Sequence, residues 1–201
     1  MFGFLKPKVT IPELAEQMFK CTLNFNDEYD KGILEKAKSS GYDVYPFSFE
    51  YLCLRMFSTV LYVCNALPPT LRGEFLDKWF ECNRLYTDSL GMEQVVPVRT
   101  KATPDGEMRA AHDLMTDRLS MYYKLAADHP LDHAVRIAER FSELCSGNPK
   151  NDWLTHVGGS TFVLRGNAAL EYLKSVKICP PGTTTSRVLE ARITDRVRNA
   201  G

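Results

Sequence analysis

One stretch of the chain, residues 49–67, constrains the fold more than any other. Apolar residues recur along it with helical spacing, as at Phe49 and Cys53, and further apolar residues such as Leu52 and Leu61 occupy its other faces. A helix that is apolar all round must be covered on every side. The pattern therefore predicts a central helix with the remaining helices packed around it.

Apolar stripes of period 3.6, bounded by caps or by Pro and Gly stops, predict further helices on both sides of this segment. The expected helices span residues 11–23, 27–38, 70–90, 103–127, 129–145 and 160–177, with a short helical turn at 153–157. We expect an interruption near Gly166, a linker or excursion over residues 91–106, and at most two short strands, near Val95 and Phe162. The sequence thus predicts an all-α fold, a single compact bundle of about seven main helices.

The chain divides into two parts by composition. Residues 1–178 are expected to form the helical domain, and residues 179–201 a Pro/Gly/Thr linker followed by a basic C-terminal helix. This C-terminal helix carries only a narrow apolar stripe, so it can pack on the body, move independently, or dock on an external acidic surface or RNA. The candidate partner-binding residues on it are Leu189, Arg192, Ile193, Arg196 and Val197.

Charge, hydropathy and cysteine spacing indicate which partners and which cellular location to expect. Lys plus Arg number 25 and Asp plus Glu number 25, so no global field attracts nucleic acid, although the basic C-terminal helix leaves such a partner possible. No uncharged run reaches the ~20 apolar residues of a spanning helix, so no membrane span is expected. The six cysteines are scattered without a C-x-x-C pair, which favours reduced thiols and a cytoplasmic location.

A candidate anion-binding site lies at Gly158, Gly159, Ser160 and Arg165. Glycines ahead of a helix expose backbone amides, and the start of a helix is partially positive, so the helix expected from residue 160 could cradle an anion. A turn followed by an N-cap gives the same pattern. The P-loop pattern is absent, so nucleotide hydrolysis is not predicted.

His129 and His133 are four residues apart, and a third donor to a metal ion would have to come from elsewhere, such as His112. A helix cap at His129 or Asp128 and a partly buried His133 account for this pair without a metal ion, so we expect no metal and no cofactor. The sequence therefore favours an intracellular helical protein-interaction module, of adaptor or regulatory type. An enzyme with a scattered His/Asp or anion-binding site, and a nucleic-acid-associated protein that uses the C-terminal helix, remain the alternatives.

Overall fold

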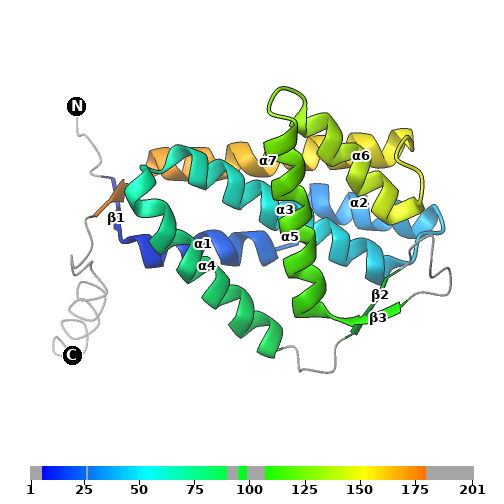
Figure 1. Cartoon of the computed structure of the whole chain (residues 1–201), viewed down its shortest axis with the longest axis horizontal. Helices are drawn as coiled ribbons and strands as arrows, with labels where there is room; N and C mark the ends of the chain where they lie inside the picture. The colour runs from blue at the N-terminus through cyan, green and yellow to red at the C-terminus, as the bar shows by residue number, and fades with distance from the viewer. Residues whose placement is uncertain (1–5, 26, 90–94, 99–106, 180–201) are drawn as a thin grey trace, which may run out of the picture.

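The computed structural model describes residues 6–25, 27–89, 95–98 and 107–179 (Figure 1). Within these residues, seven helices pack into one bundle, which confirms the predicted all-α fold. The helices are α1 (Ile11–Leu23), α2 (Glu28–Ser39), α3 (Val44–Ala66), α4 (Pro69–Ser89), α5 (Ala111–Asp128), α6 (His133–Ser146) and α7 (Asp152–Ser175). The C-terminal segment and its candidate partner-binding residues, Leu189, Arg192, Ile193, Arg196 and Val197, lie outside the described residues.

Helix α3 is the central helix that the sequence predicts. Every residue from Glu50 to Val60 is buried, and α1, α2, α4, α5, α6 and α7 all contact α3. By length and composition α3 could also cross a membrane, but 72% of its most apolar window is covered by the rest of the protein. The absence of a membrane span stays a prediction, and the apolar character of α3 is accounted for by burial in the bundle.

Two helix starts illustrate how the local sequence sets the elements. Thr10 forms a capping box with Glu13: Glu13 N donates to Thr10 Oγ1 at 3.3 Å, and Thr10 N donates to the Glu13 carboxylate at 2.8 Å. Helix α3 begins earlier than the predicted residue 49. Asp43 caps it by accepting from Tyr45 N at 3.3 Å, and Pro46 fits the first turn, where its missing N–H is not needed.

The four described strands form two small sheets. Strands β2 (Val95–Val98) and β3 (Glu107–Ala110) pair antiparallel, so the prediction that residues 103–110 begin a helix is wrong over β3. Pro97 lacks an N–H to donate, but a two-stranded sheet consists only of edge strands, which tolerate it. Strands β1 (Lys8–Val9) and β4 (Lys177–Ile178) pair parallel and tie the end of α7 to the start of α1 (Figure 1).

Helix α7 is continuous where the sequence predicts a short turn, a loop and an interrupted second helix. Asn151 caps it by accepting from Leu154 N at 3.1 Å, and the helix then passes through Gly158, Gly159 and Gly166. Each helical glycine costs about 1 kcal/mol relative to alanine. Two of them permit close packing: a Cβ at Gly158 would lie 3.1 Å from the Ala138 backbone, and one at Gly166 would lie 2.5 Å from Tyr62.

Gly166→Ala and Gly159→Ala form a matched pair that tests this packing. Alanine at residue 166 would collide with the Tyr62 ring, so we expect the free energy of unfolding to fall by about 1–3 kcal/mol. At Gly159 the nearest atom to a new Cβ is Ala138 Cβ at 3.7 Å, which is ordinary contact. The gain in helix propensity should therefore raise the free energy of unfolding by up to about 1 kcal/mol. Urea unfolding followed by circular dichroism measures both, and equal effects would contradict the close approach of α7 to α3.

Candidate functional site

Helices α6 and α7 form an antiparallel hairpin whose close packing depends on small residues. The buried face of α6 carries Ile137, Ala138 and Phe141, and Gly158 of α7 lies directly against Ala138 and Phe141. Gly147, with a φ of 73°, ends α6 in the left-handed conformation that glycine adopts without strain. These contacts bury one face of the hairpin, whereas Val135 of α6 and Val163 of α7 stay exposed beside it.

A groove of about 730 Å³ runs along that open side between α6 and α7. Apolar residues line most of it: Ala134, Val135, Ala138, Pro149, Gly159 and Val163. Val135 is 57% exposed and Val163 is 41% exposed, so these two side chains gain little from the folded monomer. They lie on different helices and can be covered together only by something placed in the groove.

Polar residues make up the rest of the lining: Glu139, Lys150, Asp152, Thr155, His156 and Ser160. Glu139 also accepts from Arg136 Nη1 at 3.0 Å. A lining that combines apolar and charged side chains suits a surface that binds another polypeptide, because the apolar groups supply affinity and the charged groups supply orientation.

The predicted anion-binding residues do not form a cradle. The start of α7 lies at Asp152, so the amides of Gly158, Gly159 and Ser160 lie inside the helix rather than at its N-terminus, and the physical basis of that prediction is absent. Gly159 and Ser160 line the groove, whereas Gly158 is buried against α6. The fourth residue, Arg165, is engaged by carboxylates of α2.

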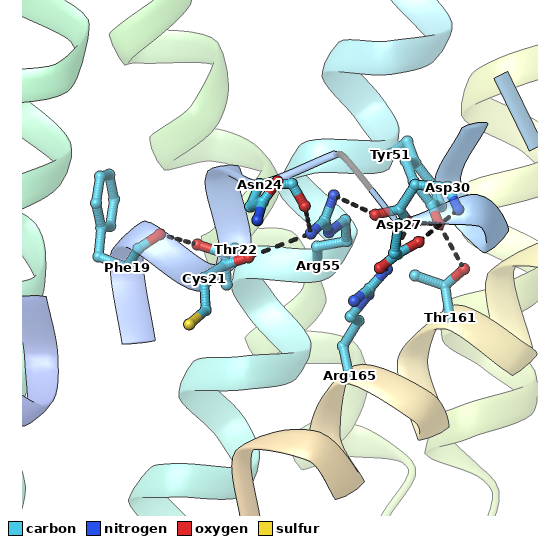
Figure 2. Close-up of polar contacts among 10 residues, drawn as sticks. All are labelled: Phe19, Cys21, Thr22, Asn24, Asp27, Asp30, Tyr51, Arg55, Thr161 and Arg165. Atoms are coloured by element: carbon cyan, nitrogen blue, oxygen red, sulfur yellow. Dashed lines mark hydrogen bonds and ion pairs between the residues drawn. The ribbon is translucent and has the colours of Figure 1, made fainter. Parts of the chain in front are cut away.

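These carboxylates belong to a buried charge network between α2, α3 and α7 (Figure 2). Asp30 Oδ2 lies 2.9 Å from Arg55 Nη1, and both side chains are fully buried. Asp30 Oδ1 accepts from Arg165 Nη2 and from the Tyr51 hydroxyl, each at 2.6 Å. Burial and the hydrogen bond to Asp30 both raise the pKa of Tyr51, which keeps its hydroxyl protonated as a donor.

Arg55 extends this network to the end of α1. Its Nη2 donates to Asn24 O at 2.7 Å and to Cys21 O at 3.3 Å (Figure 2). Its guanidinium carbon also lies 4.2 Å from the centre of the Phe25 ring. A cation at this position is favoured by the partial negative charge at the C-terminal end of α1. Burial and the nearby Arg165 lower the pKa of Arg55, and Asp30 opposes that shift.

With Asp27 included, the network contains two carboxylates and two guanidinium groups, since Arg165 Nη2 also lies 2.7 Å from Asp27 Oδ2. Its charges therefore balance internally, which indicates a structural role. Sequence inspection missed this arrangement, although Arg55 within an apolar helix was a signal, because a buried charge requires a partner. The partners Asp30 and Arg165 are distant in sequence and could not be identified from spacing.

A second buried ion pair connects α3 to α5. Arg118 Nε donates to both oxygens of Glu50 at 2.8 Å, and Arg118 Nη2 lies 2.7 Å from Glu50 Oε1. Burial raises the pKa of Glu50, and Arg118 opposes that shift. The pair is bidentate and lies beside the buried Cys53, so its geometry also suits a tie between helices.

The histidines that the sequence singles out do not converge. His129 Nδ1 lies 3.6 Å from the Asp132 carboxylate on the surface, whereas the His133 ring packs edge-on against Phe162. In the part of the chain that the structure describes, no group of three or more His, Cys, Asp and Glu side chains could share a metal ion. The absence of a metal site stays a prediction for the whole chain.

Comparison with known proteins leaves the groove unassigned. No protein-family model matches the chain, and neither a curated protein nor a solved structure matches it. The choice of a candidate site therefore depends on geometry, which distinguishes the charge-balanced network between α2, α3 and α7 from the exposed groove between α6 and α7.

Asp30→Asn tests the structural role of the network. The substitution keeps the shape of the side chain but leaves the fully buried Arg55 without a counter-ion, so we expect a loss of about 3–5 kcal/mol in the free energy of unfolding. Asp132→Asn removes a surface ion pair with Arg136 and is the control, which should leave the urea midpoint nearly unchanged. A similarly small effect of both substitutions would show that the network does not stabilise the fold.

The ion pair between Asp27 and Arg165 should make stability depend on pH. Partial burial raises the pKa of Asp27, but the hydrogen bond from Asp30 N and the Arg165 guanidinium lower it below the ordinary 3.8. The folded state therefore prefers the carboxylate, and this contribution is complete above pH 3.8 and lost as the pH falls through the lowered pKa.

Asp27→Asn retains a good N-cap but removes this charge. Because Asp27 is 46% exposed, the wild type should exceed the variant by less than about 1 kcal/mol at neutral pH. Urea unfolding at a series of pH values should show the difference shrinking as the pH falls below about 4. A difference that stays constant down to pH 2 would contradict the assigned ion pair.

Proposed function

We propose that this protein is a helical protein-interaction module, and that the groove between α6 and α7 binds an amphipathic helix of a protein partner. The observation that carries the proposal is the pair of exposed valines, Val135 and Val163, on opposite walls of a groove floored by small residues. Such a module serves as an adaptor or a regulator. We place it in the cytoplasm, which the scattered cysteines of the sequence support.

A helix is the partner element that suits this groove best. Two antiparallel helices present ridges of side chains with a depression between them, and a third helix packs its own ridge into that depression. Ala134, Ala138 and Gly159 have small or absent side chains, so they leave room for a larger apolar residue of the partner. From Asp152 to Val163 the α7 wall is about 17 Å long, which corresponds to three turns of a partner helix.

A second groove, of about 500 Å³ between α5 and α6, is a weaker candidate. Charged side chains occupy much of its lining, and they are partnered within the protein: Arg136 pairs with Glu139 at 3.0 Å, and Arg140 pairs with Glu143. An apolar partner placed there would have to displace these ion pairs or their hydration. The α6–α7 groove also includes Glu139 of one of these pairs, but fewer of its lining residues are charged.

Substitutions at neighbouring positions of α7 test the proposal. Val163 lines the groove, whereas Leu164 is 50% exposed on the same helix and does not line it. Affinity purification of the full chain from its own cell extract, with quantitative mass spectrometry, should detect a partner protein that Val163→Asp or Val135→Asp reduces at least about tenfold, because an aspartate would be desolvated in the contact.

Leu164→Asp is the matched control in the same experiment. It introduces the same charge on the same helix outside the groove, so the partner should be retained. If circular dichroism shows that Val163→Asp and Val135→Asp are folded and both variants still retain the same set of proteins as the wild type, the proposed function is wrong.

A further inference from the structure

The chain itself contains a segment with the properties of the proposed partner helix. Leu189, Ile193 and Val197 recur every four residues, so a helix over residues 186–199 would present them as one stripe. Arg192 and Arg196 each precede a residue of the stripe and would lie along one edge of it. A narrow apolar stripe with charged flanks suits a shallow groove better than a closed core.

The described chain ends where this segment can reach the groove. Cys179 follows β4 and donates its N–H to Val9 O at 2.8 Å, which fixes the end of the described chain beside the C-terminal end of α7. Val163 lies about 18 Å from Ser175 along α7, at 1.5 Å per residue. Residues 180–185 can extend about 20 Å, and one helical turn from Ser186 adds about 5 Å.

The direction and length of the C-terminal segment fit those of the groove. A segment that returns along α7 reaches the Val135 and Val163 end of the groove first and continues toward Pro149 and Asp152. Residues 186–199, if helical, would be about 20 Å long, against about 17 Å for the groove wall between Asp152 and Val163.

Charge also favours this occupant. The charged residues of the groove are Glu139, Asp152 and Lys150, with a net charge of −1, and the segment has four arginines against one glutamate and one aspartate, with a net charge of +2. Arg192 and Arg196, beside the stripe, would face the rim of the groove while Ile193 enters its floor. Complementary charge at a rim orients such a contact more than it strengthens it.

We propose that residues 186–199 of this chain occupy the α6–α7 groove of the same molecule, and that an external helix must compete with them. The proposal depends on the proposed function in one respect, that the groove accepts an amphipathic helix. A linker as short as residues 180–185 gives the segment an effective concentration in the millimolar range, so even weak intrinsic affinity suffices for substantial occupancy. The C-terminal segment would then regulate access to the groove.

Hydrogen exchange of the full-length protein, read by mass spectrometry, tests this contact directly. Amides of residues 189–197 should exchange at least about fivefold more slowly in the wild type than in Ile193→Asp, since docking protects them and the aspartate disrupts the stripe. Ala191→Asp, opposite the stripe on a helix, is the matched control and should retain the protection. On the body, Val163→Asp should remove the protection and Leu164→Asp should not.

The concentration dependence identifies which copy supplies the segment. If protection is unchanged over a hundredfold dilution, the segment docks within one molecule. If protection is lost on dilution and light scattering shows a larger mass at the higher concentration, a second copy supplies the segment and the proposal is overturned. Exchange in the wild type as fast as in Ile193→Asp, or equal losses in Val163→Asp and Leu164→Asp, also overturns it.

The outcome is separable from that of the proposed function. Under competition, Ile193→Asp should increase recovery of the partner that Val163→Asp removes. An unprotected segment with a partner still lost in Val163→Asp would refute only the intramolecular contact. A protected segment without any groove-dependent partner would refute only binding to another protein.

Discussion

The burial of Arg55 is the constraint on which the rest of the structure depends. A guanidinium group in the middle of the central helix loses its hydration, and this cost is offset only if charges and carbonyls surround it. Asp30 supplies the charge, and the end of α1 supplies the carbonyls of Cys21 and Asn24. Satisfying this one side chain therefore fixes α1 and α2 against α3.

The same network reaches α7 and so determines where the groove forms. Asp30 and Asp27 bind Arg165, which holds one side of α7 against α2. Gly158, two turns earlier on the same side of α7, admits α6 at close range. With this side covered, the surface of α7 that carries Asp152, Gly159 and Val163 lies beside α6 and lines the groove.

Local sequence signals predicted the elements whose ends are set by nearby residues. The capping box at Thr10 and the apolar stripes along α1 to α4 act within a few residues, so they could be recognised directly. The start of α7 was misjudged because the interior glycines resemble a helix boundary, and only contact with Ala138 and Tyr62 explains them. Likewise β3 requires pairing with β2, which no local pattern around residues 107–110 specifies.

The sequence predicted only part of the candidate site, for a related reason. The sequence predicted an anion site formed by the backbone amides of residues 158–160. Two of these residues, Gly159 and Ser160, do line the groove, but they do so on the surface of a continuous helix and not with free N–H groups. The sequence around Val135 and Val163 does not show that these valines are exposed, because a valine can be buried or exposed and only the fold decides which.

The energies involved suit a contact that forms reversibly. Covering Val135 and Val163 recovers only part of the roughly 1.5–3 kcal/mol that each valine gains on full burial. An external helix must in addition offset the loss of its translational and rotational freedom, which a tethered segment has largely lost already. A shallow groove of this kind therefore discriminates by the stripe and flanking charges of its occupant, and a weak internal competitor is sufficient to shift the balance between its bound states.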